Sequence, residues 1–438
     1  APAGPTPWGQ PHRVAAEVVR RDVHVTTSDR GMSVVAWEAR VTTGRWAAHA
    51  AIRSKSGRWS APIRLSDPGE RVAELTSLAW GDGNVSVVWE REVSKDNWQF
   101  RMRTVGSDGS WRPVRTLLTA AYAFSGFQVD VNDAGWVLLS WENGDHRVRS
   151  AVLTTDGPWR HLRPLAVKSP GTTFRFIDNP KGAFVSNGGD IRVVAWGRHH
   201  GTKGRALWLA RLADHGKWRY TRIGPTNGDE LEYNWVDQAR IVSDPRGDVA
   251  VTWSQQDPAT HQWTTLLRYD PAGKGRTTVR VLSHARCDRD WNWCADVALS
   301  DAGNAIVAWA MPGTDAQNLF VARRPRSGAL GHAHGVYSES VSYVFSGIAV
   351  AANAQGDAVV NFIGGNKNVF LQEFARCPAD GQCRPLVVRN NKPSWLDPVS
   401  ISVAPSGKTV MAWGEGCGGG DEACRATSVW ARSLAAGR

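Results

Sequence analysis

Short apolar segments alternate with polar turns along the whole chain, and one ten-residue pattern recurs. Its clearest copy is residues 300–309, SDAGNAIVAW, in which a polar turn with Gly303 precedes β-branched and apolar residues and Trp309 closes the segment. Enrichment in Val, Ile and Trp with glycine at the turns is typical of strands rather than helices. The pattern therefore predicts a turn followed by a buried strand.

Eight copies of this pattern can be recognised. Their closing aromatic residues are Trp37, Trp89, Trp141, Trp196, Trp253, Trp309, Phe362 and Trp413. Successive closing residues are 52, 52, 55, 57, 56, 53 and 51 positions apart. A repeat of this period indicates one supersecondary unit that is used many times.

Each repeat contains four short strand patterns. In the first repeat they cover residues 23–25, 33–37, 46–52 and 59–65. Four strands in a repeat of this length match one blade of a β-propeller. We therefore predict an all-β chain forming a single β-propeller domain over 1–438, with eight four-stranded blades. The blades are expected to begin near residues 22, 74, 127, 174, 237, 295, 347 and 398. Seven blades is the alternative, because the fourth repeat carries extra residues at 174–189.

The two ends of the chain complement each other. The eighth repeat has a third strand at 428–431 but no fourth. Residues 8–14, WGQPHRV, resemble the fourth strand of the first repeat, WSAPIRL at 59–65. We predict that residues 8–16 complete the last blade, which would leave no exposed edge at the seam.

The charge balance points to anionic partners. Lys and Arg number 52 against 41 Asp and Glu, for a net charge of +11. A basic surface favours acidic polysaccharide, cell wall or nucleic acid. Basic clusters such as 323–326 are short, so nucleic acid ranks below polysaccharide. The sequence has no apolar run of about 18 residues, so no membrane insertion is expected.

The six cysteines form three close pairs, which suggests export. The pairs are Cys287 with Cys294, Cys377 with Cys383, and Cys417 with Cys424. None has the spacing of a zinc site, so local disulfides and an oxidising compartment are the better interpretation. The sequence begins APAGP, as a secreted protein can after signal-peptide removal. We expect an extracellular protein with no metal and no cofactor.

The repeats resemble those of secreted bacterial propellers of the sialidase-like and TolB-like kind, across essentially the whole chain. The resemblance concerns architecture. The sialidase Asp box, S-x-D-x-G-x-x-W, is not reproduced, because six positions separate Gly303 from Trp309. The sialidase arginine triad cannot be placed either. The resemblance implies a propeller fold and no particular activity, because propellers host many functions.

Tryptophan helps to separate function from architecture. Of 23 Trp, 17 fit repeated strand positions and two flank the first turn of a repeat, and the other four lie in links between the outer strand of one blade and the inner strand of the next. In propellers such links cross a face near the central channel, where aromatic rings beside polar groups suit sugars. The alternative is that these rings seal the face or contact a protein. The predicted substrate-binding residues are Arg198, Trp235, Arg289, Asp290, Trp291, Asn292, Trp293, Tyr343 and Trp395.

The loop from Cys287 to Cys294 is the most specific of these features. A disulfide there would hold its Arg, Asp, Asn and Trp side chains in a restricted geometry, as in a preorganised binding loop. Structural stapling alone would also explain the two cysteines.

Proton-transfer chemistry has several candidates. A lyase acting on a uronate polymer needs a cation to neutralise the carboxylate and a His or Tyr to move the α-proton. Arg198 with the two following histidines, placed in the link after Trp196, would suit. Carboxylates near the starts of inner strands, including Asp22 and Glu74, are expected to converge at the channel mouth, with a solvated rim as the alternative. The predicted catalytic residues are His199, His200, Tyr233, Asp237 and Asp397.

Three glutamates form a further pattern. Glu38, Glu90 and Glu142 each follow the closing Trp of three successive repeats. They are candidates for the same face, and inter-blade ion pairs with arginine are the alternative.

Two classes of function remain. The first is a secreted propeller that binds, and as an enzyme would process, an extracellular acidic polysaccharide, by lyase or glycoside hydrolase chemistry. The second is a non-catalytic lectin-like or protein-binding scaffold. The sequence leaves the presence of catalysis open.

Overall fold

The structure is a computed structural model. It describes residues 9–17, 19, 23–42, 44–94, 97–121, 127–143, 147–154, 160–162, 165–169, 172–199, 205–213, 216–223, 239–256, 263–272, 277–283, 295–312, 317–336, 343–366, 369–387, 400–404, 406–416 and 426–434. These residues form strands and turns, and no helix among them is long and apolar enough to cross a membrane.

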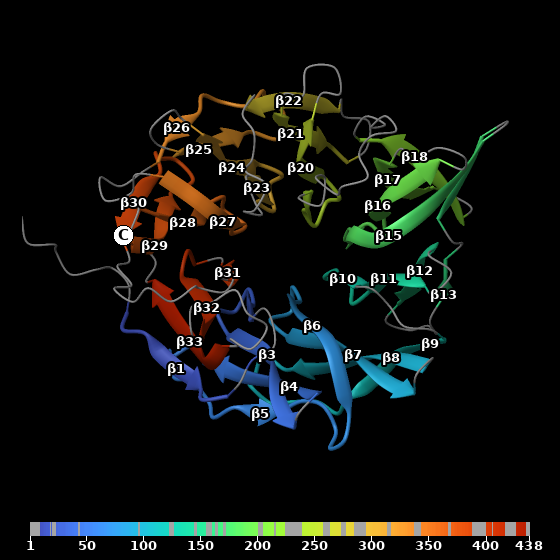
Figure 1. The fold of residues 1–438 in the computed structure, drawn as a ribbon, viewed down its shortest axis with the longest axis vertical. Helices are drawn as coiled ribbons and strands as arrows, with labels where there is room; N and C mark the ends of the chain where they lie inside the picture. Colours follow the sequence, from blue (N-terminus) through green and yellow to red (C-terminus); the bar gives the residue numbers. More distant parts are fainter. Residues whose placement is uncertain are drawn as a thin grey trace, which may run out of the picture. The chain divides into compact units, whose positions relative to one another are not determined.

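Each sequence repeat forms one antiparallel sheet, so the chain is an eight-bladed β-propeller (Figure 1). The first sheet contains β2 (His24–Thr27), β3 (Ser33–Thr42), β4 (Arg45–Arg53) and β5 (Ile63–Arg64). The second contains β6 (Arg71–Ala79), β7 (Val85–Ser94), β8 (Asn97–Val105) and β9 (Arg115–Ala121). The third contains β10 (Phe127–Val131), β11 (Val137–Asn143), β12 (Arg147–Leu153) and β13 (Arg160–His161).

The fourth sheet differs from the prediction because it has five strands. They are β14 (Ala166–Ser169), β15 (Thr172–Val185), β16 (Ile191–His199), β17 (Arg205–Ala213) and β18 (Lys217–Arg222). The extra residues of this repeat lengthen the inner strand β15, and its first part pairs with β14 from Ser169↔Thr172 to Ala166↔Arg175. The insertion thus adds a strand to a complete blade, and the seven-blade alternative is wrong.

The fifth to seventh sheets again have four strands each. The fifth contains β19 (Arg240–Ser243), β20 (Val249–Gln256), β21 (Trp263–Asp270) and β22 (Thr278–Ser283). The sixth contains β23 (Ala295–Leu299), β24 (Ala305–Pro312), β25 (Gln317–Arg324) and β26 (His334–Gly335). The seventh contains β27 (Tyr343–Ala352), β28 (Ala358–Asn366), β29 (Val369–Cys377) and β30 (Arg384–Val387).

The eighth sheet joins the two ends of the chain, as predicted. It contains β31 (Ser400–Val403), β32 (Thr409–Gly416), β33 (Ala426–Leu434) and, as its outer strand, β1 (His12–Ala15). His12 pairs with Ala431, and Gly9 N–H donates to the Ser433 carbonyl at 2.9 Å. Figure 1 shows β1 beside β33. Trp8, which suggested this pairing, lies outside the described residues.

The sheets belong to two compact units, which are described separately. The first consists of residues 1–91, 101–115 and 285–438, and the second of 92–100 and 116–284. The expectation of a single domain therefore stays a prediction. Below, the link end of a sheet is the end where the chain leaves for the next sheet, and the turn end is the opposite one.

Aromatic residues of the second strands pack between neighbouring sheets. In the first unit, Trp37 is fully buried in a cluster with Val410 and Val429 of the eighth sheet. Trp89 is likewise buried against residues of the first sheet. In the second unit, Trp253 packs with apolar residues of the fourth sheet. Burying a side chain of this size stabilises the fold by about 2–3 kcal/mol, which confirms these repeat tryptophans as packing residues.

Backbone N–H groups at the open edges of inner strands donate hydrogen bonds to side chains of the neighbouring inner strand. Ser400 and Ser402 Oγ accept the N–H groups of Val25 and Thr27, each at 2.9 Å. Carboxylates do the same elsewhere: Asp296 accepts Val350 N–H at 2.7 Å, and Asp130 accepts Val185 N–H at 2.8 Å. Burial raises the pKa of Asp130 to about 7, although hydrogen bonds from backbone N–H groups oppose the shift. Unpaired buried N–H groups are costly, so these bonds hold neighbouring sheets in register.

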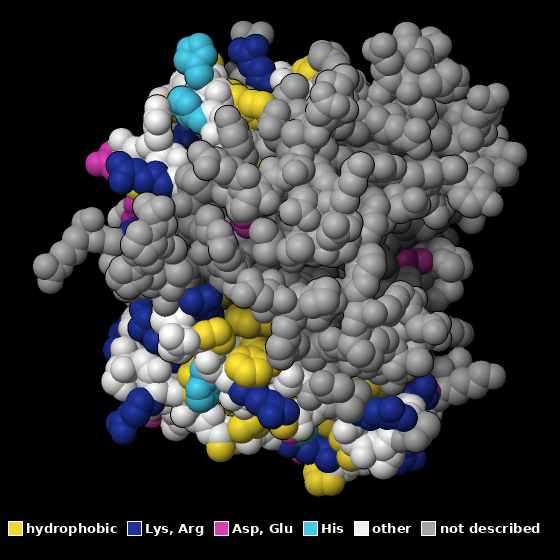
Figure 2. Space-filling model, turned by 60° about the vertical axis from the view of Figure 1, so that its left-hand side comes forward, with side chains coloured by type: hydrophobic (Ala, Val, Ile, Leu, Met, Phe, Trp, Pro, Cys, Tyr) yellow, Lys and Arg dark blue, Asp and Glu magenta, His cyan; other side chains and the backbone are white. Residues whose placement is uncertain are grey.

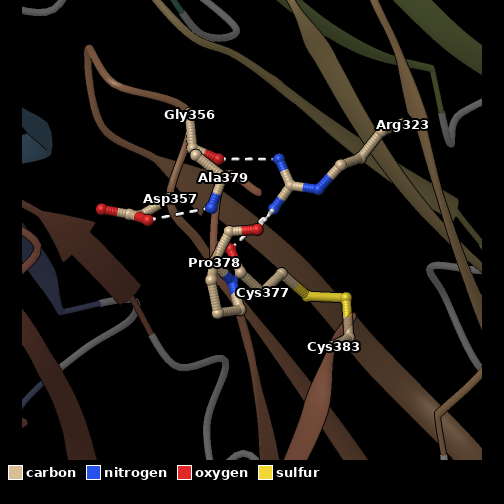
Figure 3. The surroundings of a disulfide bond; sticks show 7 residues. All are labelled: Arg323, Gly356, Asp357, Cys377, Pro378, Ala379 and Cys383. Atoms are coloured by element: carbon tan, nitrogen blue, oxygen red, sulfur yellow. Dashed lines mark hydrogen bonds between the residues drawn. A yellow bond between two sulfur atoms is a disulfide. The ribbon is translucent and has the colours of Figure 1, made fainter. Parts of the chain in front are cut away.

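One predicted disulfide lies at the turn end of the seventh sheet (Figure 3). Cys377 and Cys383 are bonded, as expected for a local staple. Arg323 of the sixth sheet donates to the carbonyl oxygens of Gly356, Cys377 and Pro378 at 2.6–2.7 Å. The stapled turn thus supplies carbonyl acceptors to the neighbouring blade. The other two cysteine pairs lie outside the described residues.

The turn glycines adopt a left-handed conformation, and some are also closely covered. Gly189 has φ 79°, and a Cβ there would lie 3.1 Å from the Trp136 ring of the preceding sheet. Gly31 has φ 80°, but a Cβ there would meet no atom within 4 Å.

Gly189→Ala should therefore destabilise the protein more than Gly31→Ala. Both substitutions place Cβ in the left-handed region, at a cost of about 1–2 kcal/mol. Only Gly189→Ala also displaces a packed ring, which should add about 1 kcal/mol or more. Thermal unfolding of the two variants measures the difference, and equal melting temperatures would contradict the covering role of Trp136.

Candidate functional site

Most predicted site residues lie outside the described residues. These are His200, Tyr233, Trp235, Asp237, Arg289, Asp290, Trp291, Asn292, Trp293, Trp395 and Asp397. Asp22, proposed to converge with Glu74 and Asp397, also lies outside. The roles assigned to all of these residues stay predictions.

Three predicted residues lie in strands rather than in the links to which we had assigned them. Arg198 and His199 are the last residues of β16, and Tyr343 is the first residue of β27. The hairpin strands continue past the closing aromatic position, because backbone pairing extends farther than the apolar pattern does. Arg198 therefore lies within a strand, opposite defined residues of the two neighbouring strands, and not in a loop.

That register places three arginines in a row at the link end of the fourth sheet. Arg198 stands directly opposite Arg175 of β15 on one side and Arg205 of β17 on the other. Residues directly opposite each other in antiparallel strands share one face of the sheet. The register therefore brings three basic residues together at one end of the fourth sheet.

A second charged group lies at the link end of the first sheet. Trp37 Nε1 donates to Glu17 Oε2 at 2.9 Å, and His49 Nδ1 lies 3.0 Å from the same oxygen. Trp37 and His49 are opposite each other in β3 and β4. Burial alone would raise the pKa of Glu17, but the contacts with His49 and Trp37 outweigh it and hold this pKa below its ordinary value.

The second sheet repeats this arrangement with arginine. Trp89 Nε1 donates to Glu70 Oε2 at 3.3 Å, while Arg91 and Arg101 each place a guanidinium nitrogen on Glu70 Oε1. Asp67 makes a further ion pair with Arg101 at 3.1 Å. The link carboxylate thus ties the incoming chain to the closing tryptophan of its own blade.

We did not predict these link carboxylates from the sequence, although a signal exists. Glu17 and Glu70 precede Trp37 and Trp89 by 20 and 19 positions, and the basic residues His49 and Arg101 follow the same tryptophans by 12. The row of arginines has no comparable signal, because Arg175 and Arg205 become neighbours of Arg198 only through strand register.

The glutamates that follow the closing tryptophans are buried. Glu38, Glu90 and Glu142 are 3, 2 and 5% exposed. Burial raises the pKa of Glu90 to about 9, and the like charges of Glu74 and Glu38 add to the shift. Glu90 Oε1 has no hydrogen-bond partner. Among the described residues, no group of three or more His, Cys, Asp or Glu could hold a metal ion, so we assign none here.

Comparison with solved structures supports the fold. A lectin from Burkholderia pseudomallei, BP39L, is 12% identical, with a TM-score of 0.52 over 85% of this chain and 99% of the lectin. The polysaccharide lyase Uly1 is 9% identical, with a TM-score of 0.51 over 98% of this chain and 100% of the lyase. At such identities the likeness shows a shared propeller fold alone. The sequence matches no protein-family model, and no curated protein sequence matches it.

The raised pKa of Glu90 predicts a pH-dependent stability. The folded state keeps a proton that the unfolded chain releases above its ordinary pKa of 4.5, so stability should fall as pH rises from there to about 9. At pH 7 the loss is about 3 kcal/mol. Glu90→Gln should remove this loss and raise the melting temperature at neutral pH.

Glu38→Gln provides the second arm of this test. It removes one of the two like charges near Glu90 and should therefore lower the pKa of Glu90. The pH range over which stability falls should then end closer to neutrality. Thermal melts across this pH range measure both effects. A Glu90→Gln variant that is less stable than wild type at pH 8 would show instead that the carboxylate is ionised and paired.

Proposed function

We propose that this propeller binds an extracellular acidic polysaccharide at the link end of its blades, with the row of Arg175, Arg198 and Arg205 contacting the anionic groups. The register that places these three arginines side by side is the observation that carries the proposal. A polymer with regularly spaced carboxylate or sulfate groups can neutralise several adjacent guanidinium groups, which bind such anions through paired hydrogen bonds.

The rest of the chain supports this choice of ligand. The net charge is +11, and Figure 2 shows Lys and Arg side chains recurring over the described surface. The predicted link tryptophans, Trp235, Trp291, Trp293 and Trp395, would supply the flat apolar surfaces on which sugar rings stack. The disulfide between Cys377 and Cys383 is compatible with an extracellular protein.

Processing of the polymer would follow from the same residues. An arginine beside a uronate carboxylate stabilises the negative charge that develops when the neighbouring carbon loses its proton. The candidates to move that proton are His199, His200 and Tyr233. His199 is the last residue of β16, where strand alternation places it on the opposite face of the sheet from Arg198. The C–O bond to the glycosidic oxygen would then break as the C=C bond forms, leaving an unsaturated uronate, and the departing oxygen would take a proton from a side chain or water. The lectin and the lyase that share the fold are consistent with binding and with processing, respectively.

The main test is binding of acidic polymers to variants of the row. Arg175→Gln, Arg198→Gln and Arg205→Gln should each weaken binding of polygalacturonate or dextran sulfate by about fivefold, because each removes one charge-assisted contact of about 1 kcal/mol. Binding should also weaken with added salt. Affinity electrophoresis with neutral dextran as the blank measures the effect.

Arg219→Gln is the matched control, because it removes an exposed arginine from the outer strand of the same sheet. It should leave binding unchanged. Melting temperatures of the row variants should be measured beside binding, so that a loss of affinity is not confused with unfolding. Equal binding by wild type and all three row variants would refute the proposal.

Turnover distinguishes the remaining functions. Ultraviolet absorbance of an unsaturated product that disappears in His199→Ala would indicate a lyase. New reducing ends without that absorbance would indicate a hydrolase, and binding without either would indicate a lectin-like protein. No binding of any acidic polymer would favour the protein-binding scaffold.

A further inference from the structure

Buried arginines at the turn ends of the sheets contact carboxylate or carbonyl oxygens, with one exception. Among the described residues, Arg53, Arg192, Arg268 and Arg324 are the arginines less than 10% exposed. Arg192 pairs with Asp190, Arg268 pairs with Asp270, and Arg324 donates to the carbonyls of Pro325 and Arg326. A buried cation without such partners is costly, so the exception requires a physical explanation.

Arg53 is that exception. It ends β4 and is 9% exposed. Its Nη2 donates to Ser433 Oγ of the eighth sheet at 3.1 Å, but no hydrogen-bond partner is found for its buried Nη1. Burial lowers the pKa of this guanidinium below its ordinary value. The group thus lies at the seam that closes the first blade on the last, with unused hydrogen-bonding capacity.

Lys408 adds a second positive charge to this seam. Ser433, which accepts the hydrogen bond from Arg53, stands opposite Val410, two residues after Lys408. Burial lowers the pKa of Lys408, and the charge of Arg53 lowers it further. Neither the turn at 53–61 nor the segments 404–409 and 426–438 contain an Asp or Glu. These three segments therefore offer no carboxylate, whereas the turn before Ser33, which stands opposite Arg53, contains Asp29.

Other blades carry a carboxylate where the eighth carries this lysine. The residue directly after the turn glycine is Asp190, Asp248 and Asp357 in the fourth, fifth and seventh blades, and Lys408 in the eighth. Asp190 pairs with Arg192 and Arg211, and Asp357 accepts Ala379 N–H at 2.9 Å. The eighth blade thus has a cation at the position where these three blades have built-in anions.

We infer that the seam between the first and eighth blades binds an oxyanion, such as sulfate, phosphate or a sulfate ester, between Arg53 and Lys408. The guanidinium offers Nη1 as a hydrogen-bond donor, and the ammonium offers up to three more. The bound anion joins two blades whose polypeptide segments come from opposite ends of the chain. Its binding stabilises the closed seam by mass action.

Sulfate titrated against chloride at constant ionic strength tests the inference. Above the dissociation constant, we expect the melting temperature to rise with the logarithm of the sulfate concentration, by about 1–2 °C for each tenfold increase. Calorimetry should show a matching saturable heat. Absence of any saturable response to sulfate or phosphate would overturn the inference.

Lys408→Asp separates a specific site from the general effect of salt. This substitution supplies the carboxylate of the fourth, fifth and seventh blades, so it should raise the melting temperature in sulfate-free buffer and abolish the saturable response. Lys217→Asp makes the same charge change at an exposed position in the fourth sheet and should retain the response. An unchanged response in Lys408→Asp would overturn the assignment.

Galactose 6-sulfate, with galactose as the blank, distinguishes the source of the anion. Binding of the ester as well as free sulfate would show that the site accepts a group carried by a sugar. Binding of free sulfate alone would show a site for the inorganic ion. Both results require the response to be absent in Lys408→Asp.

Discussion

Packing of the second-strand aromatic residue between neighbouring sheets is the interaction on which the structure depends. A four-stranded sheet has two faces and cannot bury either one by itself. Trp37 and Trp89 are fully buried because each fills the space between its own sheet and the preceding one. Within each compact unit a sheet therefore requires its neighbour, and the two chain ends meet in one sheet, where β1 pairs with β33.

Once the sheets are stacked, their edges and buried charges need partners. Inner-strand N–H groups find hydroxyl or carboxylate acceptors on the adjacent inner strand, such as Ser400 and Asp296. The closing tryptophans of the first two blades donate to link carboxylates, and these carboxylates also contact basic residues on the third strands. Arg53 stands apart, because its buried Nη1 has no such partner. The proposed oxyanion site addresses this uncompensated positive charge.

The candidate site was less predictable than the blades. Aromatic and polar link residues were singled out because the repeat does not require them, but a link has no periodic pattern from which its geometry follows. Arg198 was identified as a binding residue, yet its partners Arg175 and Arg205 were not. They lie 23 positions before it and 7 after it in sequence, and only pairing in β15, β16 and β17 makes them neighbours.

The sequence by itself determined the all-β class, the eight blades and the closure by the N-terminal strand. These features depend on local alternation and on a repeated pattern, which are properties of the chain alone. Tertiary structure decided the fifth strand of the fourth sheet, the burial of Glu90 and the unpartnered Nη1 of Arg53. Each of these depends on which side chains from other strands or blades come close, and that proximity exists only after the sheets have paired and packed.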